Sequence, residues 1–178
     1  QGRVAGGNGS LLAEGAYALR QWGRPGCQAG ERMSVDRSLV RLILVIAWLN
    51  GVHTLDHMIR GDFHWPLDGQ SVGFVLVVAA IYLVIGMGIR LSNRGVVGPL
   101  FWAIIGGGGL AFGWLSHFSP FTDQPLHVIY GSYHNATGGA LAVLCLMLLM
   151  GVVLTATLYS IYLWHHQRHI TVSRPVSR

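Results

Sequence analysis

Residues 72–89 read VGFVLVVAAIYLVIGMGI, a stretch without a single charged side chain. A transmembrane helix needs about 20 predominantly apolar residues, and an uncharged run of about 18 or more is a candidate span. Two further uncharged stretches follow, at residues 96–114 and 138–164. Because only helices and closed barrels satisfy their backbone groups within lipid, these three stretches predict membrane-spanning helices.

The first apolar stretch is different, because only residues 42–55 are uncharged, between Arg41 and Asp56. That length is too short to cross a membrane. A spanning helix here must extend Arg41 toward one interface, where its long side chain can reach water. It then carries Asp56 into or near the other leaflet. The sequence therefore predicts an all-α fold, an integral membrane four-helix transmembrane bundle, with spans at about residues 37–58, 71–91, 96–117 and 136–164.

The composition agrees with a membrane protein. Apolar residues make up 52% of the chain and charged residues 11%, against about 25% charged residues in soluble domains. All twelve basic residues are arginine, and they flank the apolar stretches instead of forming a patch of their own. The net charge of +5 is therefore interpreted as a topology signal, and nucleic acid is excluded as a partner. The expected partners are the lipid bilayer and, as a second class, subunits of a larger membrane complex.

The arginines also predict the orientation. Those that flank the spans lie before the first span, between the second and third, and after the fourth; they are Arg32, Arg37, Arg41, Arg90, Arg94, Arg168, Arg174 and Arg178. The two other loops contain a single arginine, Arg60. By the positive-inside rule both termini are cytoplasmic, so the orientation is N-in/C-in. We expect a multi-pass protein of a bacterial inner (plasma) membrane.

Residues 1–32 differ from the rest of the chain. They are rich in glycine, and Glu14 and Gly15 interrupt their short apolar stretch, so they do not form a convincing signal peptide. We expect residues 1–32 to be a non-native or disordered leader. Residues 33–170 are then the four-span membrane domain, and residues 171–178 are a cytoplasmic tail.

Six of the nine histidines fall on the arginine-poor side, and they are His53, His57, His64, His117, His127 and His134. Polar groups inside a membrane cost free energy and usually mark function. At about 100° per residue, Asn50, His53, Thr54 and His57 share one helix face. The imidazoles of His53 and His57 are one turn apart, so both can reach a single ion.

The candidate ligands divide into two sets. The inner set is His53, His57, His117 and His134, and the outer set is His127, His64 and Asp123. Placing His134 near the interface assumes a helix that runs from about Pro125 through residue 134, with His127 two turns before it. Asp56 lies beside the histidine stripe, where it can bind the metal or orient a histidine ring.

The ligand types leave the cofactor open between a transition-metal ion and haem b. Neutral imidazoles suit Cu, Fe and Zn, and haem iron takes axial histidines. Histidines at positions i and i+4 cannot be opposite axial ligands of one haem, so they favour a compact site or one axial ligand with a neighbour. The glycines at 106–109 and Gly113 predict close helix packing, with a flat cofactor surface as the alternative.

The string HTLDH at residues 53–57 is similar to the HxxDH string that ends the first helix of small four-span bacterial membrane proteins. This resemblance covers residues 33–164 and implies no activity. The histidine cluster itself favours a metal- or haem-binding protein of redox or electron-transfer function and, if an enzyme, a membrane metal-dependent oxidoreductase. The alternatives are a metal-handling protein for Cu, Zn or Fe and a non-enzymatic subunit of a larger membrane complex.

Overall fold

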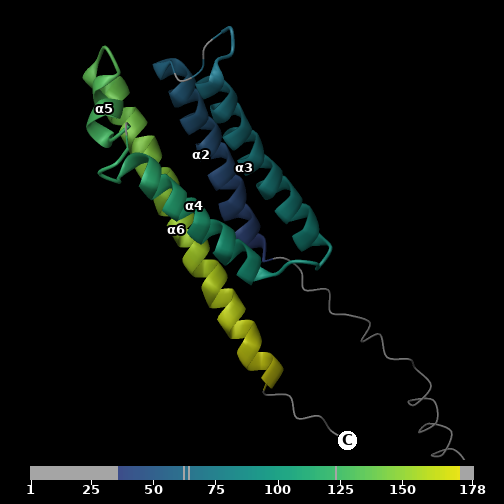
Figure 1. The fold of residues 1–178 in the computed structure, drawn as a ribbon. Helices are drawn as coiled ribbons and strands as arrows, with labels where there is room; N and C mark the ends of the chain where they lie inside the picture. The colour runs from purple at the N-terminus through teal and green to yellow at the C-terminus, as the bar shows by residue number, and fades with distance from the viewer. Residues whose placement is uncertain (1–35, 62, 64, 123, 173–178) are drawn as a thin grey trace, which may run out of the picture. The chain divides into compact units, whose positions relative to one another are not determined.

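The computed structural model describes residues 36–61, 63, 65–122 and 124–172. The expected leader lies outside these residues, as does most of the expected tail. The elements in the described part are helices: α2 (Arg37–Arg60), α3 (Gly69–Asn93), α4 (Pro99–His117), α5 (Leu126–Gly131) and α6 (Ala136–Val172), as Figure 1 shows. Four of them, α2, α3, α4 and α6, are long and apolar enough to cross a membrane. The predicted all-α class with four candidate spans is confirmed, whereas the N-in/C-in orientation stays a prediction.

Local sequence signals set where these helices begin and end. The carboxylate of Asp36 accepts a hydrogen bond of 2.8 Å from the backbone N–H of Ser38 and so caps α2. α2 ends at Arg60 and is capped by Gly61, whose φ of 98° is in the left-handed region that favours glycine. Asp68 caps α3 in the same way as Asp36, and Pro99 occupies the first turn of α4.

α6 is the helix on which α2, α4 and α5 pack. It contacts α2, α4 and α5, and α3 lies beside α2 (Figure 1). The glycines of α4 make the close approach to α6, since a Cβ atom added to Gly113 would lie 2.6 Å from the sulfur of Met150. A Cβ atom on Gly106 would overlap the hydroxyl of Thr157. Both contacts confirm that glycines of this run serve helix packing.

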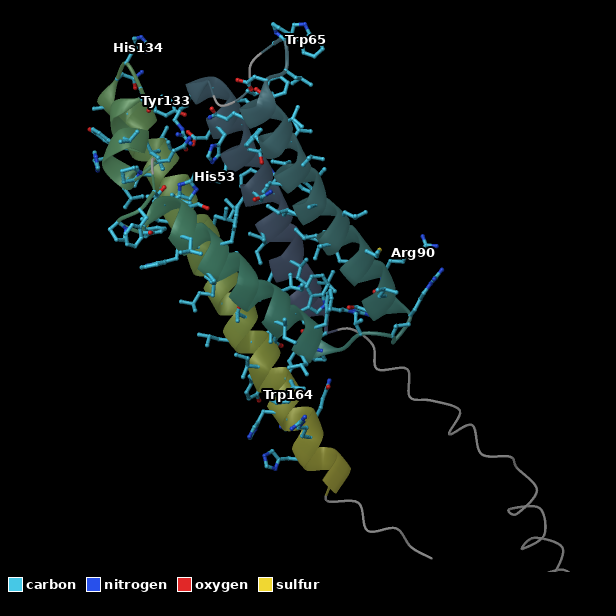
Figure 2. All side chains as sticks on the ribbon, in the orientation of Figure 1. His53, Trp65, Arg90, Tyr133, His134 and Trp164 are labelled. Atoms are coloured by element: carbon cyan, nitrogen blue, oxygen red, sulfur yellow. The ribbon has the colours of Figure 1, made fainter. Side chains whose placement is uncertain are left out.

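Two apolar clusters hold the helices together at opposite ends. The first contains Leu39, Ile43 and Trp102, at the start of α2 and of α4. The second contains Ile129, Ala142 and Leu146, and it fixes the short α5 against the start of α6. In Figure 2 Arg90 and Trp164 lie toward the first end, and Trp65 and His134 lie at the second. We call this second end the histidine end, because the candidate site lies there.

Candidate metal centre

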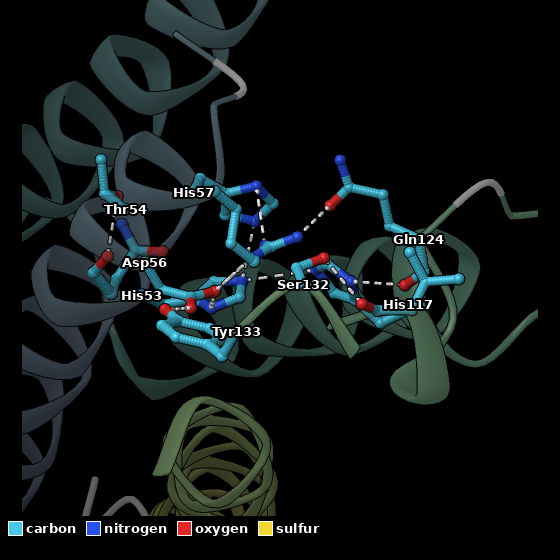
Figure 3. A network of polar contacts seen from close by, with 11 residues as sticks. His53, Thr54, Asp56, His57, His117, Gln124, Ser132 and Tyr133 are labelled. Carbon is cyan, nitrogen blue, oxygen red and sulfur yellow. Dashed lines mark hydrogen bonds and ion pairs between the residues drawn. The ribbon is translucent and has the colours of Figure 1, made fainter. Parts of the chain in front are cut away.

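Three imidazoles from two helices converge at the histidine end. His53 and His57 are one turn apart on α2, and His117 is the last residue of α4. The Nε2 atom of His53 lies 3.1 Å from Nε2 of His57 and 3.3 Å from Nε2 of His117 (Figure 3). The three residues each offer a ligand nitrogen within 4.8 Å of the others, so this histidine triad could hold a metal ion.

The spacing of these nitrogens fits one coordination sphere. Imidazole nitrogens bind zinc at about 2.0–2.1 Å, so two of them in a tetrahedral sphere lie about 3.3 Å apart. Ligands on opposite sides of one ion would instead be about 4 Å apart at that bond length. The observed separations of 3.1 and 3.3 Å are in the range expected for adjacent ligands, and the third pair, His57 and His117, offers nitrogens within 4.8 Å of each other.

Burial and the loop after α4 position the triad. His53 is 8% exposed and His117 is 7% exposed, whereas His57 is half-buried. The chain turns back after His117, and the hydroxyl of Thr122 donates to the carbonyl oxygen of Ser116. This turn brings the carbonyl oxygen of Gln124 within 3.4 Å of Nδ1 of His117. A carbonyl can only accept, so it fixes the proton of neutral His117 on Nδ1 and leaves the Nε2 lone pair facing His53.

Nε2 of His53 takes part in both short contacts of the triad. To accept from His57 it would need a lone pair, and to donate to His117 it would need a proton. A neutral imidazole nitrogen carries one or the other, so Nε2 of His53 cannot do both. Arg60, which can only donate, lies 3.3 Å from Nδ1 of His57 beside these contacts.

A metal ion would use these nitrogens differently. If Nε2 of His53 and of His117 bound an ion, both would do so through their lone pairs, and His117 would keep its bond to Gln124. His57 would bind through Nε2 with its proton on Nδ1, which would cost its contact with Arg60. His53 then carries its proton on Nδ1, a buried atom without a hydrogen-bond partner among the described residues. The nearest carboxylate oxygen, on Asp56, is 3.9 Å from that atom. The donor set therefore fits a metal ion.

Asp56 is held beside the triad by two other side chains. It is 6% exposed, and Arg60 donates to one of its carboxylate oxygens through Nε at 3.0 Å and forms an ion pair with the same oxygen through a terminal nitrogen, also at 3.0 Å. Tyr133 donates its hydroxyl proton to the second carboxylate oxygen. Burial of the phenol raises the pKa of Tyr133 to about 12, and the hydrogen bond to Asp56 contributes to the shift. Tyr133 therefore remains a donor, and Asp56 is placed to orient His53.

Sequence reasoning did not single out Arg60, Gln124 or Tyr133 as site residues. Arg60 carried a signal, because it is the one arginine of the arginine-poor loops and follows Asp56 by one helical turn. It also donates to the side-chain oxygen of Gln124 at 3.1 Å, which joins α2 to the loop after α4. The roles of Gln124 and Tyr133 depend on tertiary contacts, and no local pattern indicates them.

Two predicted ligands lie elsewhere. His127 and His134 are both exposed, and Figure 2 shows His134 at the tip of the histidine end, away from His53. The predicted helix through residue 134 is wrong, because α5 ends at Gly131. The side chain of Asn135 then accepts from the backbone N–H of Gly138 at 2.7 Å and starts α6. The intervening turn directs Tyr133 inward and His134 outward. His64 and Asp123 lie outside the described residues.

The comparisons with known proteins gave no match: no family model matches the chain, and neither does a curated protein or a solved structure. Function is therefore inferred from the geometry of the histidine triad and its surroundings.

Proposed function

We propose that this protein is a membrane metalloprotein that binds one transition-metal ion through Nε2 of His53, His57 and His117 and uses it in electron transfer. The observation that carries the proposal is the convergence of three imidazole nitrogens, with two short Nε2 separations among them. The arginine distribution supports a location near the outer face of a bacterial inner membrane.

A single ion suits this site better than haem b. Opposite axial ligands would need the iron and the ring plane between them, and a separation of 3.3 Å between His53 and His117 leaves no room for either. Three protein ligands leave at least one coordination position for water or substrate, as in catalytic centres. Cu and Fe are the redox-active ions among those that imidazole suits.

Asp56 acts as a positioning residue in this proposal. Closing the 3.9 Å gap to Nδ1 of His53 by about 1 Å would make the carboxylate–histidine–metal arrangement that is common around bound metals. Arg60 and Tyr133 hold the carboxylate in place and compensate its burial. His127 and His134 are not part of the proposed ligand set, because both are exposed.

The experiment is a metal inventory of the full chain, purified in mild detergent with an affinity tag that contains no histidine. We expect one Cu or Fe per chain, no haem absorption band, and a reversible redox signal. His53→Ala and His117→Ala should lose the ion, and the matched control His134→Ala should keep it. Equal losses in all three variants, or no bound metal in the wild-type protein, would overturn the proposal.

Metal handling is the second candidate function. His57 is only half-buried and the triad supplies three ligands, which favours an ion that exchanges with a partner. Stoichiometric zinc, with no redox signal, would favour this candidate over electron transfer. Loss of the metal to a soluble chelator within minutes would support it further.

A further inference from the structure

A cavity of about 640 Å³ runs between α2, α3, α4 and α6. Small-molecule sites typically enclose about 300–1,000 Å³, so the cavity has the size of a ligand pocket. His53 and His117 line it at one end, and Trp102 lines it at the other. Between them the walls are almost entirely apolar. On the side of α4 the wall includes Gly108 and Phe112, both of which are exposed.

Two residues that line this cavity have a buried side-chain nitrogen without a hydrogen-bond partner among the described residues: His53, through Nδ1, and Asn50. Asn50 lines the cavity one turn before His53, and its side-chain nitrogen is buried without a hydrogen-bond partner among the described residues. An amide NH₂ group is a donor of two hydrogen bonds, and burying such a donor unsatisfied is unfavourable. Asn50 therefore indicates a ligand that brings an acceptor to this part of an otherwise apolar cavity.

We propose that the cavity binds a lipid-soluble quinone, with one ring carbonyl oxygen accepting from the side chain of Asn50. The ring would lie beside His53 and His117, and the apolar tail would follow the cavity toward Trp102. Three features favour this class: the unpaired amide donor of Asn50 suits a carbonyl, the apolar walls disfavour charged molecules, and glycines without side chains leave a flat surface for a ring. The exposed wall at Gly108 and Phe112 gives access from the bilayer. Binding at Asn50 does not require the metal ion, so the inference goes beyond the proposed function.

Two neighbouring glycines of α4 provide a matched pair of variants. A Cβ atom added to Gly107 or to Gly108 would meet no atom within 4 Å, so both positions have room for a larger side chain. Of these two glycines, Gly108 lines the cavity and Gly107 does not. Gly108→Leu should therefore block the cavity, whereas Gly107→Leu adds the same side chain to the same helix outside it.

The experiment measures equilibrium binding of a short-chain ubiquinone to the full chain in phosphatidylcholine nanodiscs, with empty nanodiscs subtracted. We expect saturable binding, weakened about tenfold or more by Gly108→Leu and unchanged by Gly107→Leu. Asn50→Leu should weaken the quinone about tenfold but leave binding of an alkylbenzene of equal tail length unchanged. Metal content, measured on the same samples, should be retained in all three variants, which also shows that they fold.

Three results would overturn the inference. The first is absence of saturable quinone binding by the wild-type chain. The second is an equal loss of quinone affinity in Gly108→Leu and Gly107→Leu. The third is an Asn50→Leu variant whose affinities for the quinone and for the alkylbenzene change by the same factor. The last result would mean that the cavity binds acyl chains without recognising a carbonyl group. A chain that binds its metal but no quinone would contradict this inference and leave the proposed function intact.

Discussion

The Nε2 atoms of His53 and His117 lie 3.3 Å apart, although the two residues are 64 positions apart in the sequence. α2 and α4 carry them, and both helices pack on α6. The contact between these imidazoles therefore depends on how closely α4 approaches α6, and on the loop that follows His117.

Replacing Asp56 with Asn should destabilise the protein. Asp56 and Arg60 form a buried ion pair, with 7% and 4% of their side chains exposed. Removing one partner of such a pair costs about 3–5 kcal/mol, because the other charge stays buried. Thermal unfolding in detergent should show a clear loss of stability. A double variant, Asp56→Asn with Arg60→Gln, should recover part of it, and simple additivity of the two single losses would contradict the pairing.

Replacing Tyr133 with Phe should weaken metal binding while the fold is retained. The variant removes the hydroxyl that orients Asp56. Loss of such an outer partner typically reduces metal affinity about 10–100-fold. The measurement is competition with a chelator of known affinity, and Tyr130→Phe is the control, because Tyr130 is exposed on α5, three residues before Tyr133. Equal effects at the two positions would mean that Tyr133 does not act through Asp56.

The same pair of proteins gives a pH prediction. The pKa of Tyr133 is raised to about 12, so the donor form is lost only as the pH rises through about 12. The ratio of wild-type to Tyr133→Phe metal affinity should therefore be constant between about pH 7 and 9, well below that pKa. A ratio that falls steadily across this range would show that the phenol ionises earlier than its environment indicates.

Adding one methyl group to Gly106 should disturb the contact between α4 and α6. The new Cβ atom would overlap the hydroxyl of Thr157, which is itself held by a 2.7 Å hydrogen bond to the carbonyl oxygen of Val153. Such overpacking typically costs about 1–3 kcal/mol. Gly107→Ala is the matched control, and unfolding temperature is the readout. Equal stability of the two alanine variants would contradict close packing at Gly106.

The predicted orientation can be tested by labelling. A cysteine placed at the exposed Trp65 should react with a membrane-impermeant maleimide in intact cells, and one placed at the exposed Arg94 should react only after lysis. This follows from the positive-inside rule. Reaction at residue 94 in intact cells would reverse the proposed orientation and place the histidine end in the cytoplasm.

The four long helices were predictable because their signal is local. Uncharged stretches such as residues 72–89 are long enough to span, and caps such as Asp68 act within one turn. His53 and His57 were predictable as a pair for the same reason, since one helical turn brings them together. His117 could be assigned to the inner set of candidate ligands because it ends an apolar stretch on the arginine-poor side.

What could not be predicted depends on contacts between elements. His134 was assigned to the inner set on an assumed helix, but the chain turns after Gly131, where the capping side chain of Asn135 starts α6. That turn places Tyr133, not His134, against Asp56. The cavity with Asn50 is also a property of four packed helices, and no local sequence pattern reveals it.

X-ray absorption at the metal edge of the purified, detergent-solubilised chain tests the histidine triad most directly. We predict one ion per chain with three imidazole nitrogens at about 2.0–2.1 Å. His117→Ala should lower the number of imidazole scatterers or empty the site. A coordination shell made of oxygen atoms alone, a porphyrin signature, or a chain purified without a stoichiometric metal would contradict the account.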